Sequence, residues 1–184
     1  MSRAGAGHTI GVAIEIPEPY GSRLDEVRAR YAQDPDEMPA HVTILPPVDI
    51  DTDLLDAVVA HLAEAAADTA PFRLVLRGTG TFRPVSPVVF VAVAEGIASC
   101  EQVEDAVRSG PLAVETRFPY HPHVTIAHDV DEADLDAAFE KLEGFYADVE
   151  IDHMTLRELR DGRWTLVREF PLGGEGTPPS SGLG

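Results

Sequence analysis

Apolar and polar positions alternate along several short segments of this chain, a pattern typical of half-buried β-strands. Five strands are predicted at residues 9–16, 41–45, 72–82, 88–94 and 123–127, and a closing hairpin pairs 147–159 with 164–170. The hairpin is expected to turn at Asp161-Gly162, a strong turn signal. We expect Pro46-Pro47 to end the second strand, and Gly78 or Gly80 to interrupt the third.

Apolar residues at intervals of three and four predict four helices between these strands. Their expected ranges are 22–32, 53–67, 99–108 and 132–142. Ser22 and Ser99 are interpreted as N-caps, because a serine hydroxyl can accept a hydrogen bond from a backbone N–H of the first helical turn. Gly110-Pro111 is expected to end the third helix.

The two halves of this predicted order resemble each other. Each contains a helix, a strand that begins His-Val-Thr-Ile, a second helix and a strand pair, and the two motif histidines lie 123 − 41 = 82 residues apart. We therefore predict an α+β, bilobal fold: two similar lobes, each with an antiparallel sheet and helices, related by a pseudo-two-fold axis with a cleft between them. One domain is expected over residues 1–172, followed by a disordered Gly/Pro/Ser-rich tail at 173–184.

Composition and charge narrow the classes of partner. Apolar residues make up 44% and charged residues 25% of the 184, which is ordinary for a globular protein, but the net charge is −18. Such a surface repels polyanions, so binding to long RNA or DNA is not expected. Cys100 is the single cysteine, and no segment has the length of a membrane span. We expect a cytoplasmic monomer that does not bind membranes.

The repeated tetrapeptide carries the candidate chemistry. Residues i and i+2 of a strand share a face, so His41 projects with Thr43, and His123 with Thr125. Two imidazoles in one cleft can serve as the base that activates a nucleophile and the acid that protonates a leaving oxygen. The threonine hydroxyls can donate to phosphate oxygens. This set suits phosphodiester cleavage without a metal.

A single His-x-Thr is a weak signal, and a third copy occurs at His153-Met154-Thr155. The functional prediction therefore depends on the two identical copies of His-Val-Thr-Ile. Each copy lies in a predicted strand and follows a loop that contains proline. A plain structural interpretation stays open, in which both are half-buried strands with polar outward faces. For His153 a structural role is favoured over a catalytic one.

These stretches resemble the 2H phosphoesterases, the 2′-5′ RNA ligase-like and cyclic phosphodiesterase group, which carry two motifs of the form hydrophobic-His-x-Thr/Ser-hydrophobic. The resemblance covers about residues 8–172 and includes Gly78-Thr79-Gly80-Thr81-Phe82 and the closing hairpin. It implies a bilobal fold, both histidines in a central cleft, and metal-independent chemistry on 2′,3′-cyclic phosphates or 2′-5′ linkages. Many relatives have a basic residue where this chain has His128, and an aromatic residue where it has Pro46-Pro47.

Several other residues are candidates for binding roles. His121 is expected at the cleft rim, where it could touch the substrate. Phe82 and Tyr120 could stack on a base there, although a structural role in the core or at the rim is at least equally compatible with both. Arg83 and Arg117 are candidate phosphate contacts, with solvated surface positions favoured. His121 and His123 have a spacing that can bind zinc, but His128 is expected on the opposite face of a regular strand, so no metal site is predicted.

The sequence thus predicts an enzyme without cofactor that opens the 2′,3′-cyclic phosphate of a small nucleotide or an RNA terminus, as in RNA processing. One motif histidine would activate water and the other would protonate the departing ribose oxygen. Two alternatives remain. One is 2′-5′ RNA ligase-type activity on RNA fragments, and the other is a non-catalytic module that binds a nucleotide phosphate.

Overall fold

The computed structural model describes residues 7–31 and 38–173. Most of the expected tail therefore lies outside the described residues. Twelve α- and β-elements follow one another along the chain, and they are β1 (Gly7–Glu15), α1 (Tyr20–Tyr31), β2 (His41–Asp51), α2 (Leu55–Ala67), β3 (Phe72–Thr81), β4 (Val88–Glu95), α3 (Ile97–Val107), β5 (His123–His128), α4 (Glu132–Leu142), β6 (Tyr146–Ile151), β7 (His153–Arg160) and β8 (Arg163–Pro171). Two short 3-10 turns, η1 (Thr52–Leu54) and η2 (Gly110–Leu112), precede α2 and follow α3.

The eight strands form one antiparallel sheet in the order β6-β3-β4-β5-β2-β1-β7-β8. Its midpoint is the pair β5 and β2, which meet at a single backbone bridge, Val42 opposite Val124. Four strands lie on each side of this narrow junction, so the sheet divides into the two lobes that the sequence predicts. The junction joins the two strands that carry the repeated tetrapeptide.

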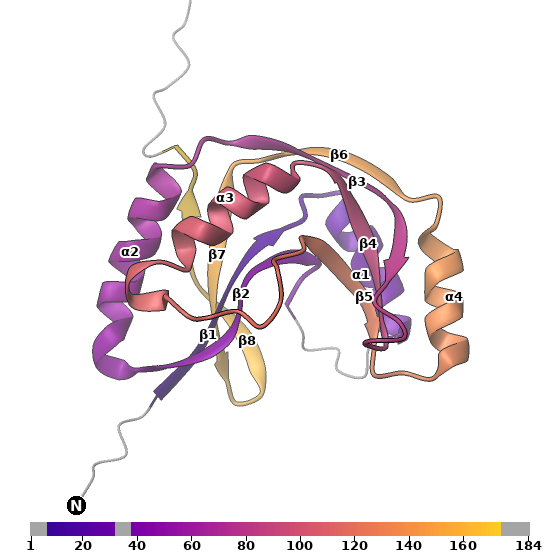
Figure 1. Ribbon diagram of the computed structural model, residues 1–184, viewed down its shortest axis with the longest axis horizontal. Coiled ribbons are helices and arrows are strands. Elements are labelled where there is room, and N and C mark those ends of the chain that lie inside the picture. Colours follow the sequence, from indigo (N-terminus) through magenta and orange to yellow (C-terminus); the bar gives the residue numbers. More distant parts are fainter. Residues whose placement is uncertain (1–6, 32–37, 174–184) are drawn as a thin grey trace, which may run out of the picture.

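One helix of each lobe packs against the other lobe, and the two arrangements correspond. Helix α1 connects β1 to β2 but packs against β5 and α4, while α3 connects β4 to β5 but packs against β2 and α2. In Figure 1, α2 lies at the left edge of the molecule and α4 at the right edge, with the sheet arched between them. This exchange gives the expected pseudo-two-fold arrangement a physical basis, because each lobe contributes a helix to the other lobe's motif strand.

The apolar residues of both motifs are buried in one continuous core. Val42, Ile44, Val124 and Ile126 have no more than 1% of their surface exposed, and they share the core with Leu24 of α1. Burial of these four side chains fixes the opposite face of each strand toward the cleft. None of the described helices combines the length and apolar composition needed to cross a bilayer.

Several expected boundaries are wrong. Strand β2 does not end at Pro46-Pro47 but continues to Asp51. Past Val42 it pairs with β1 only, so one of its edges is open, and a proline without an N–H can stand on an open edge. Ser99 lies inside α3 and caps nothing; Gly96, with a φ of 96°, precedes that helix. The strand expected at 147–159 is two strands: β6 forms one edge of the sheet, and β7 lies near the other edge, between β1 and β8.

Candidate active site

The two motifs lie side by side in opposite directions. Because Val42 is directly opposite Val124 in an antiparallel pair, the same register sets His41 across from Thr125 and Thr43 across from His123. All four side chains are half-buried, whereas the apolar residues between them are buried. Each histidine is therefore flanked by its own threonine along the strand and by the other motif's threonine across the junction.

A β-bulge follows the threonine in both motifs. On β2, Thr43 pairs with Ala13 and Leu45 with Val12, which leaves Ile44 without an opposing residue. On β5, Thr125 pairs with Phe90 and Ala127 with Val89, which leaves Ile126 in the same position. A bulge reverses the side-chain alternation that follows it. The prediction that His128 faces away from His123 is therefore wrong, because the extra residue turns His128 back to the cleft.

Both motif histidines are anchored by the same backbone contact. The Nδ1 of His41 is 2.7 Å from the carbonyl oxygen of Pro39, and the Nδ1 of His123 is 2.7 Å from the carbonyl oxygen of His121. A carbonyl can only accept a hydrogen bond, so Nδ1 carries the proton in both rings. Nε2 is then the ring nitrogen whose protonation can change during a reaction. His41 and His123 therefore have the same tautomer when they are neutral.

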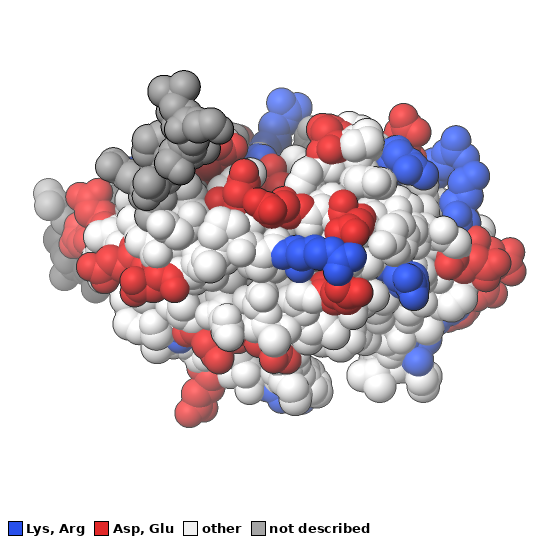
Figure 2. Space-filling view, turned by 90° about the horizontal axis from the view of Figure 1, so that it is seen from above, with Lys and Arg blue, Asp and Glu red and all other residues white. Residues whose placement is uncertain are grey.

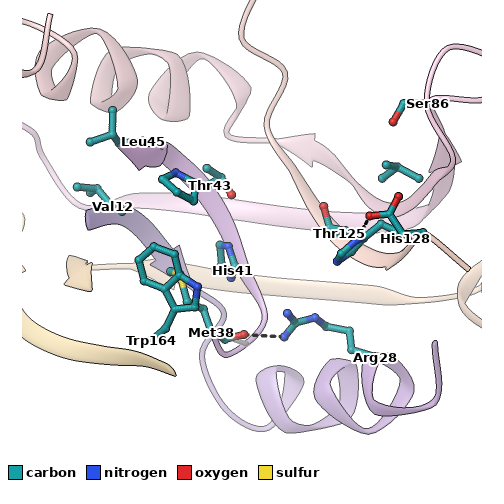
Figure 3. Close-up of a pocket in the computed structure, with 14 residues that line it drawn as sticks. Val12, Arg28, Met38, His41, Thr43, Leu45, Ser86, Thr125, His128 and Trp164 are labelled. Carbon is teal, nitrogen blue, oxygen red and sulfur yellow. Dashed lines mark hydrogen bonds and ion pairs between the residues drawn. The ribbon is translucent and has the colours of Figure 1, made fainter. Parts of the chain in front are cut away.

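His41 lines a hollow of about 380 Å³, together with Thr43 and Thr125. Arg28 projects from α1 into this space, His128 enters from β5 and Trp164 forms a wall from β8 (Figure 3). The Arg28 guanidinium donates to Asp25 at 2.6 Å and to the carbonyl of Met38 at 2.9 Å. This hollow therefore combines hydroxyl, imidazole and guanidinium groups, all of which can donate to an anionic ester.

His123 lines a second hollow of about 610 Å³. Its walls are mostly apolar or aromatic, with Phe82, Phe118, Tyr120 and His121 beside His123. Thr43 and Ser86 line both hollows and mark where they meet. The three rim residues predicted from sequence, Phe82, Tyr120 and His121, are thus brought together with the second motif.

Aromatic rings enclose His123. Phe82 lies edge-on to the His123 ring with 5.0 Å between centroids, and Phe90 lies 5.2 Å away. Phe90 can lie flat over β3 because Gly80 stands opposite it, where a Cβ would come within 2.6 Å of the ring. Burial lowers the pKa of His123, an effect that the His121 carbonyl partly offsets by favouring the charged ring.

Tyr120 has a structural contact as well as a place in the second hollow. Its hydroxyl donates to the backbone carbonyl of Thr43 at 2.9 Å, which ties the loop before β5 to β2. Burial raises the pKa of its phenol, so the hydroxyl keeps its proton. Tyr120 is therefore a positioning residue for the first motif, a role that its distance of 77 residues from Thr43 hid from the sequence.

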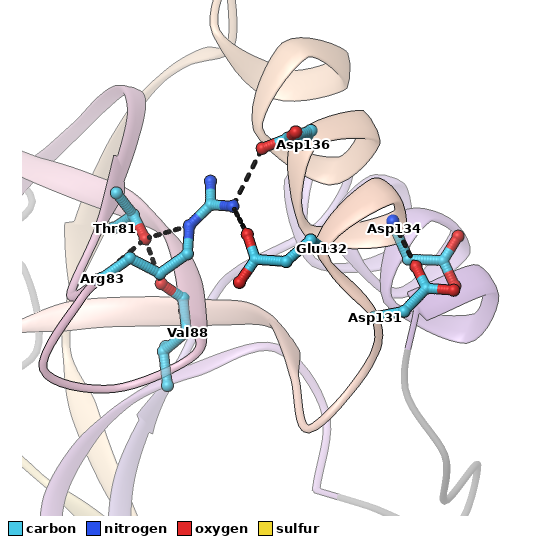
Figure 4. A network of polar contacts seen from close by, with 7 residues as sticks. All are labelled: Thr81, Arg83, Val88, Asp131, Glu132, Asp134 and Asp136. Carbon is cyan, nitrogen blue, oxygen red and sulfur yellow. Dashed lines mark hydrogen bonds and ion pairs between the residues drawn. The ribbon is translucent and has the colours of Figure 1, made fainter.

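Other candidate residues lie elsewhere. The ring of His153, the first residue of β7, contacts Asp152 at 2.6 Å, and Thr155 is fully buried against the carbonyl of Ala13. Arg83 bridges Glu132 and Asp136 of α4 at 2.8 and 2.9 Å (Figure 4). The guanidinium of Arg117 lies over the ring of Phe118. The third His-x-Thr thus lines neither of the two hollows, and Arg83 connects the loop after β3 to α4.

Charge over the molecule matches the expectation from composition. On the face shown in Figure 2, acidic side chains are spread widely, and the Lys and Arg side chains stand among them. Within the described ranges 7–31 and 38–173, no group of three or more His, Cys, Asp or Glu side chains is arranged to hold a metal ion. The histidines at 121, 123 and 128 instead line two different hollows.

Sequence patterns did not reveal several of the lining residues. Arg28 is four positions after the buried Leu24 and so stands on the buried side of α1, where an arginine is unusual enough to have been a signal. Trp164 is the single tryptophan, beside the predicted hairpin turn. Ser86, between two strands, carries no pattern that distinguishes it from a loop residue.

Known proteins share this architecture. The chain is 26% identical to proteins named as putative phosphoesterases from Oceanobacillus iheyensis (89% of this chain, 97% of that protein) and Geobacillus kaustophilus (91% and 98%). Its fold is similar to that of E. coli LigT in complex with 3′-AMP, with a TM-score of 0.70 at 20% identity over 90% of this chain and 98% of LigT. The structure of TT0787 from Thermus thermophilus gives a TM-score of 0.62 at 23% identity, over 91% and 100%.

The sequence-family comparison is more specific. The model of the 2′-5′ RNA ligase superfamily matches residues 16–163, which include both His-Val-Thr-Ile motifs, both bulges and the junction between the lobes. The resemblance inferred from the paired motifs is confirmed by this match. The chain belongs to the 2′-5′ RNA ligase superfamily, the 2H phosphoesterases.

Proposed function

We propose that this protein is a metal-independent phosphodiesterase that opens the 2′,3′-cyclic phosphate of a small nucleotide or an RNA end. The observation that carries the proposal is the matched pair of histidines on adjacent strands, each with Nδ1 bound to a carbonyl and Nε2 left as the proton-transfer nitrogen. Acid and base on either side of one phosphorus atom are what in-line displacement requires.

The proposed roles follow from the surroundings of the two rings. His123, whose pKa is lowered by burial, is neutral near pH 7 and takes a proton from the attacking water. The water oxygen bonds to phosphorus as the bond from phosphorus to one ribose oxygen breaks. His41 gives its Nε2 proton to that departing oxygen, so a ribose hydroxyl and a phosphate monoester are formed.

Threonines and one arginine would stabilise the charge on phosphorus. Thr43 and Thr125 line the same hollow as His41, and their hydroxyls can donate to the non-bridging oxygens. Arg28 adds a guanidinium to this hollow, in a chain whose net charge of −18 would otherwise repel the substrate. LigT, which has this fold, was solved with 3′-AMP, a monoester of the kind that such ring opening leaves.

The test is to incubate the protein with the four 2′,3′-cyclic nucleotides and follow ring opening by chromatography, with and without EDTA. We expect turnover that EDTA does not change. His41→Ala and His123→Ala should each lower kcat by about 10²–10⁴, the range of general acid–base catalysis. Full activity in either variant, loss of activity with EDTA, or nucleotide binding without any turnover would contradict the proposal.

A further inference from the structure

The hollow beside His123 is far larger than a water nucleophile requires. Its volume is about 610 Å³, whereas one water occupies roughly 30 Å³ of liquid. Volumes of several hundred Å³ are typical of pockets that take an organic ligand. Something larger than water therefore fits on this side of the reacting phosphorus.

Apolar side chains at the mouth of this hollow are unusually exposed. Val85 and Phe118 have 85% and 68% of their surface exposed, the two highest values among large apolar side chains in the described part of the chain. Both line this hollow, from different loops. Exposed apolar groups gathered at one opening leave a surface that a flat apolar ligand can cover.

The hollow also contains a charged pair. Glu104 and Arg108 both line it and stand one turn apart on and just after α3. The Arg108 Nε lies 2.7 Å from the Glu104 Oε1, and the two side chains are only 14% and 9% exposed. That Nε–H is buried and is not aligned for a hydrogen bond with any described group. Donors and acceptors thus stand together in an otherwise apolar space.

The pair decides which kind of ligand group suits the hollow. Its charges cancel, so it gives no net attraction to a second phosphate. It offers acceptor oxygens from Glu104 next to guanidinium donors from Arg108, which match a neutral group with donors and acceptors on one edge. Arginine and carboxylate side chains recognise nucleobase edges in this way. The hollow beside His41, with Arg28, His128, Asp129 and two threonine hydroxyls, is the more polar of the two and suits phosphate and ribose.

We infer that the hollow beside His123 is a nucleobase subsite, in which the aromatic walls stack on the base and the Glu104–Arg108 pair selects its edge. This inference rests on the proposed function, because it identifies which part of a cyclic nucleotide the second hollow takes. The base lies against Phe118 and Phe82, and its polar edge points to α3. Glu104 and Arg108 are then specificity-determining residues.

The first test removes the stacking surface. Phe118→Ala is an exposed substitution that leaves the core intact, and Val114→Ala, on the same loop but outside the hollow, is its matched control. We expect Phe118→Ala to raise KM for 2′,3′-cyclic nucleotides about tenfold, since stacking on an aromatic side chain contributes substantially to base binding. KM for glycerol 1,2-cyclic phosphate, which has no base, should not change. An equal change for both substrates, or none for the nucleotides, would overturn the inference.

The second test concerns base selection. Glu104→Gln keeps the shape of the side chain but replaces an acceptor oxygen with a donor, and Glu101→Gln, exposed on the same helix, is the control. We expect Glu104→Gln to change the ratio of kcat/KM between the preferred and least preferred of the four bases by about tenfold or more. An unchanged ratio in a variant that melts as the unaltered protein does contradicts the role of the pair. If Glu104→Gln does not fold, Val85→Ala at the exposed rim takes its place, with a raised KM for nucleotides alone as the expected result.

Binding separates this inference from the proposed function. Nucleoside 3′-monophosphates can be titrated by calorimetry whether or not the protein turns over cyclic phosphates. Binding that weakens in Phe118→Ala supports the subsite even if no ring opening is found. Ring opening with unchanged binding in Phe118→Ala overturns the subsite and leaves the proposed function standing.

Discussion

The two motif regions of this protein have the same backbone and different surroundings. Each tetrapeptide gives one half-buried histidine, one half-buried threonine, a bulge at the isoleucine and an Nδ1 contact with the carbonyl two residues earlier. Around His41 stand polar and charged groups from α1, β5 and the loop after it, with Trp164 as a wall. Around His123 stand the rings of Phe82, Phe90 and His121.

In the proposed mechanism, this difference lets a duplicated motif supply two different chemical roles. An acid and a base must differ in protonation at the same pH, and unlike environments push the pKa values of two identical residues apart. Aromatic walls remove water from His123 and favour its neutral form, while the hollow beside His41 holds Arg28 and two threonines. The repeat sets the symmetry, and segments outside the repeat break it.

The largest expected effect comes from removing both histidines. If the two rings act in one concerted displacement, His41→Ala/His123→Ala should lower kcat no further than about the worse single variant, since residues that act as a unit are not additive. Single-turnover rates with a 2′,3′-cyclic nucleotide measure this. A double variant whose loss equals the product of the single losses would show that the two regions act independently.

Substituting the two motif threonines should have smaller effects on kcat than removing both histidines. Thr43→Val and Thr125→Val each remove one donor while keeping the shape of the side chain, so we expect kcat to fall about 10²-fold or more in each. Thr43 lines both hollows, and Thr125 only the one beside His41. KM for the nucleotide should therefore rise more in Thr43→Val. Thr165→Val, on exposed β8, is the control, and an effect there as large as at Thr43 would point to altered folding.

The pH profile tests the assigned roles directly. In the proposed mechanism the active form has neutral His123, and burial places its pKa below the ordinary 6.5. As the pH falls through that lowered pKa, His123 becomes charged and kcat/KM should fall, so the acidic limb lies below pH 6.5. Phe82→Ser admits water to the His123 ring and should move this acidic limb to a higher pH. A limb that stays in place in Phe82→Ser would mean that it reports another group.

The smallest expected effects are on the free energy of unfolding, and they come from substituting two glycines. A Cβ on Gly80 would lie 2.6 Å from the Phe90 ring, whereas one on Gly11 would meet Trp164 at an ordinary 3.6 Å. Gly80→Ala should lower the free energy of unfolding by about 1–3 kcal/mol, because Phe90 must move. Gly11→Ala should leave it near its original value, since the alanine also restricts the unfolded chain. Urea denaturation measures both, and equal losses would mean that the aromatic wall has room to adjust.

Much of the site could be predicted because it follows from short-range rules. Period-two alternation placed His41 with Thr43 and His123 with Thr125, and burial of the intervening residues enforces that arrangement. Helix α4 has the expected bounds of 132 and 142, where periodicity, an Asp131 cap and acidic first-turn residues agree. The rim residues at 120 and 121 are next to a motif, so the chain itself carries them to the cleft.

The features predicted wrongly, the end of β2 and the direction of His128, depend on residues that are distant in the sequence. Pro46-Pro47 can lie within β2 only because β5 leaves that edge open. The two bulges arise from register against β1 and β4, and no local pattern shows that Ile126 is the extra residue that turns His128 around. The link between Tyr120 and the Thr43 carbonyl joins segments 77 residues apart.

By itself, the sequence determined which residues could do the chemistry and that they come in two equivalent copies, since side-chain type and strand periodicity are local properties. The tertiary structure decided how the copies differ. Arg28 from α1 and Trp164 from β8 border one histidine's hollow, while Phe82 and the Glu104–Arg108 pair border the other's. Protonation and ligand fit depend on what surrounds a group, and only the packing of distant segments supplies those surroundings.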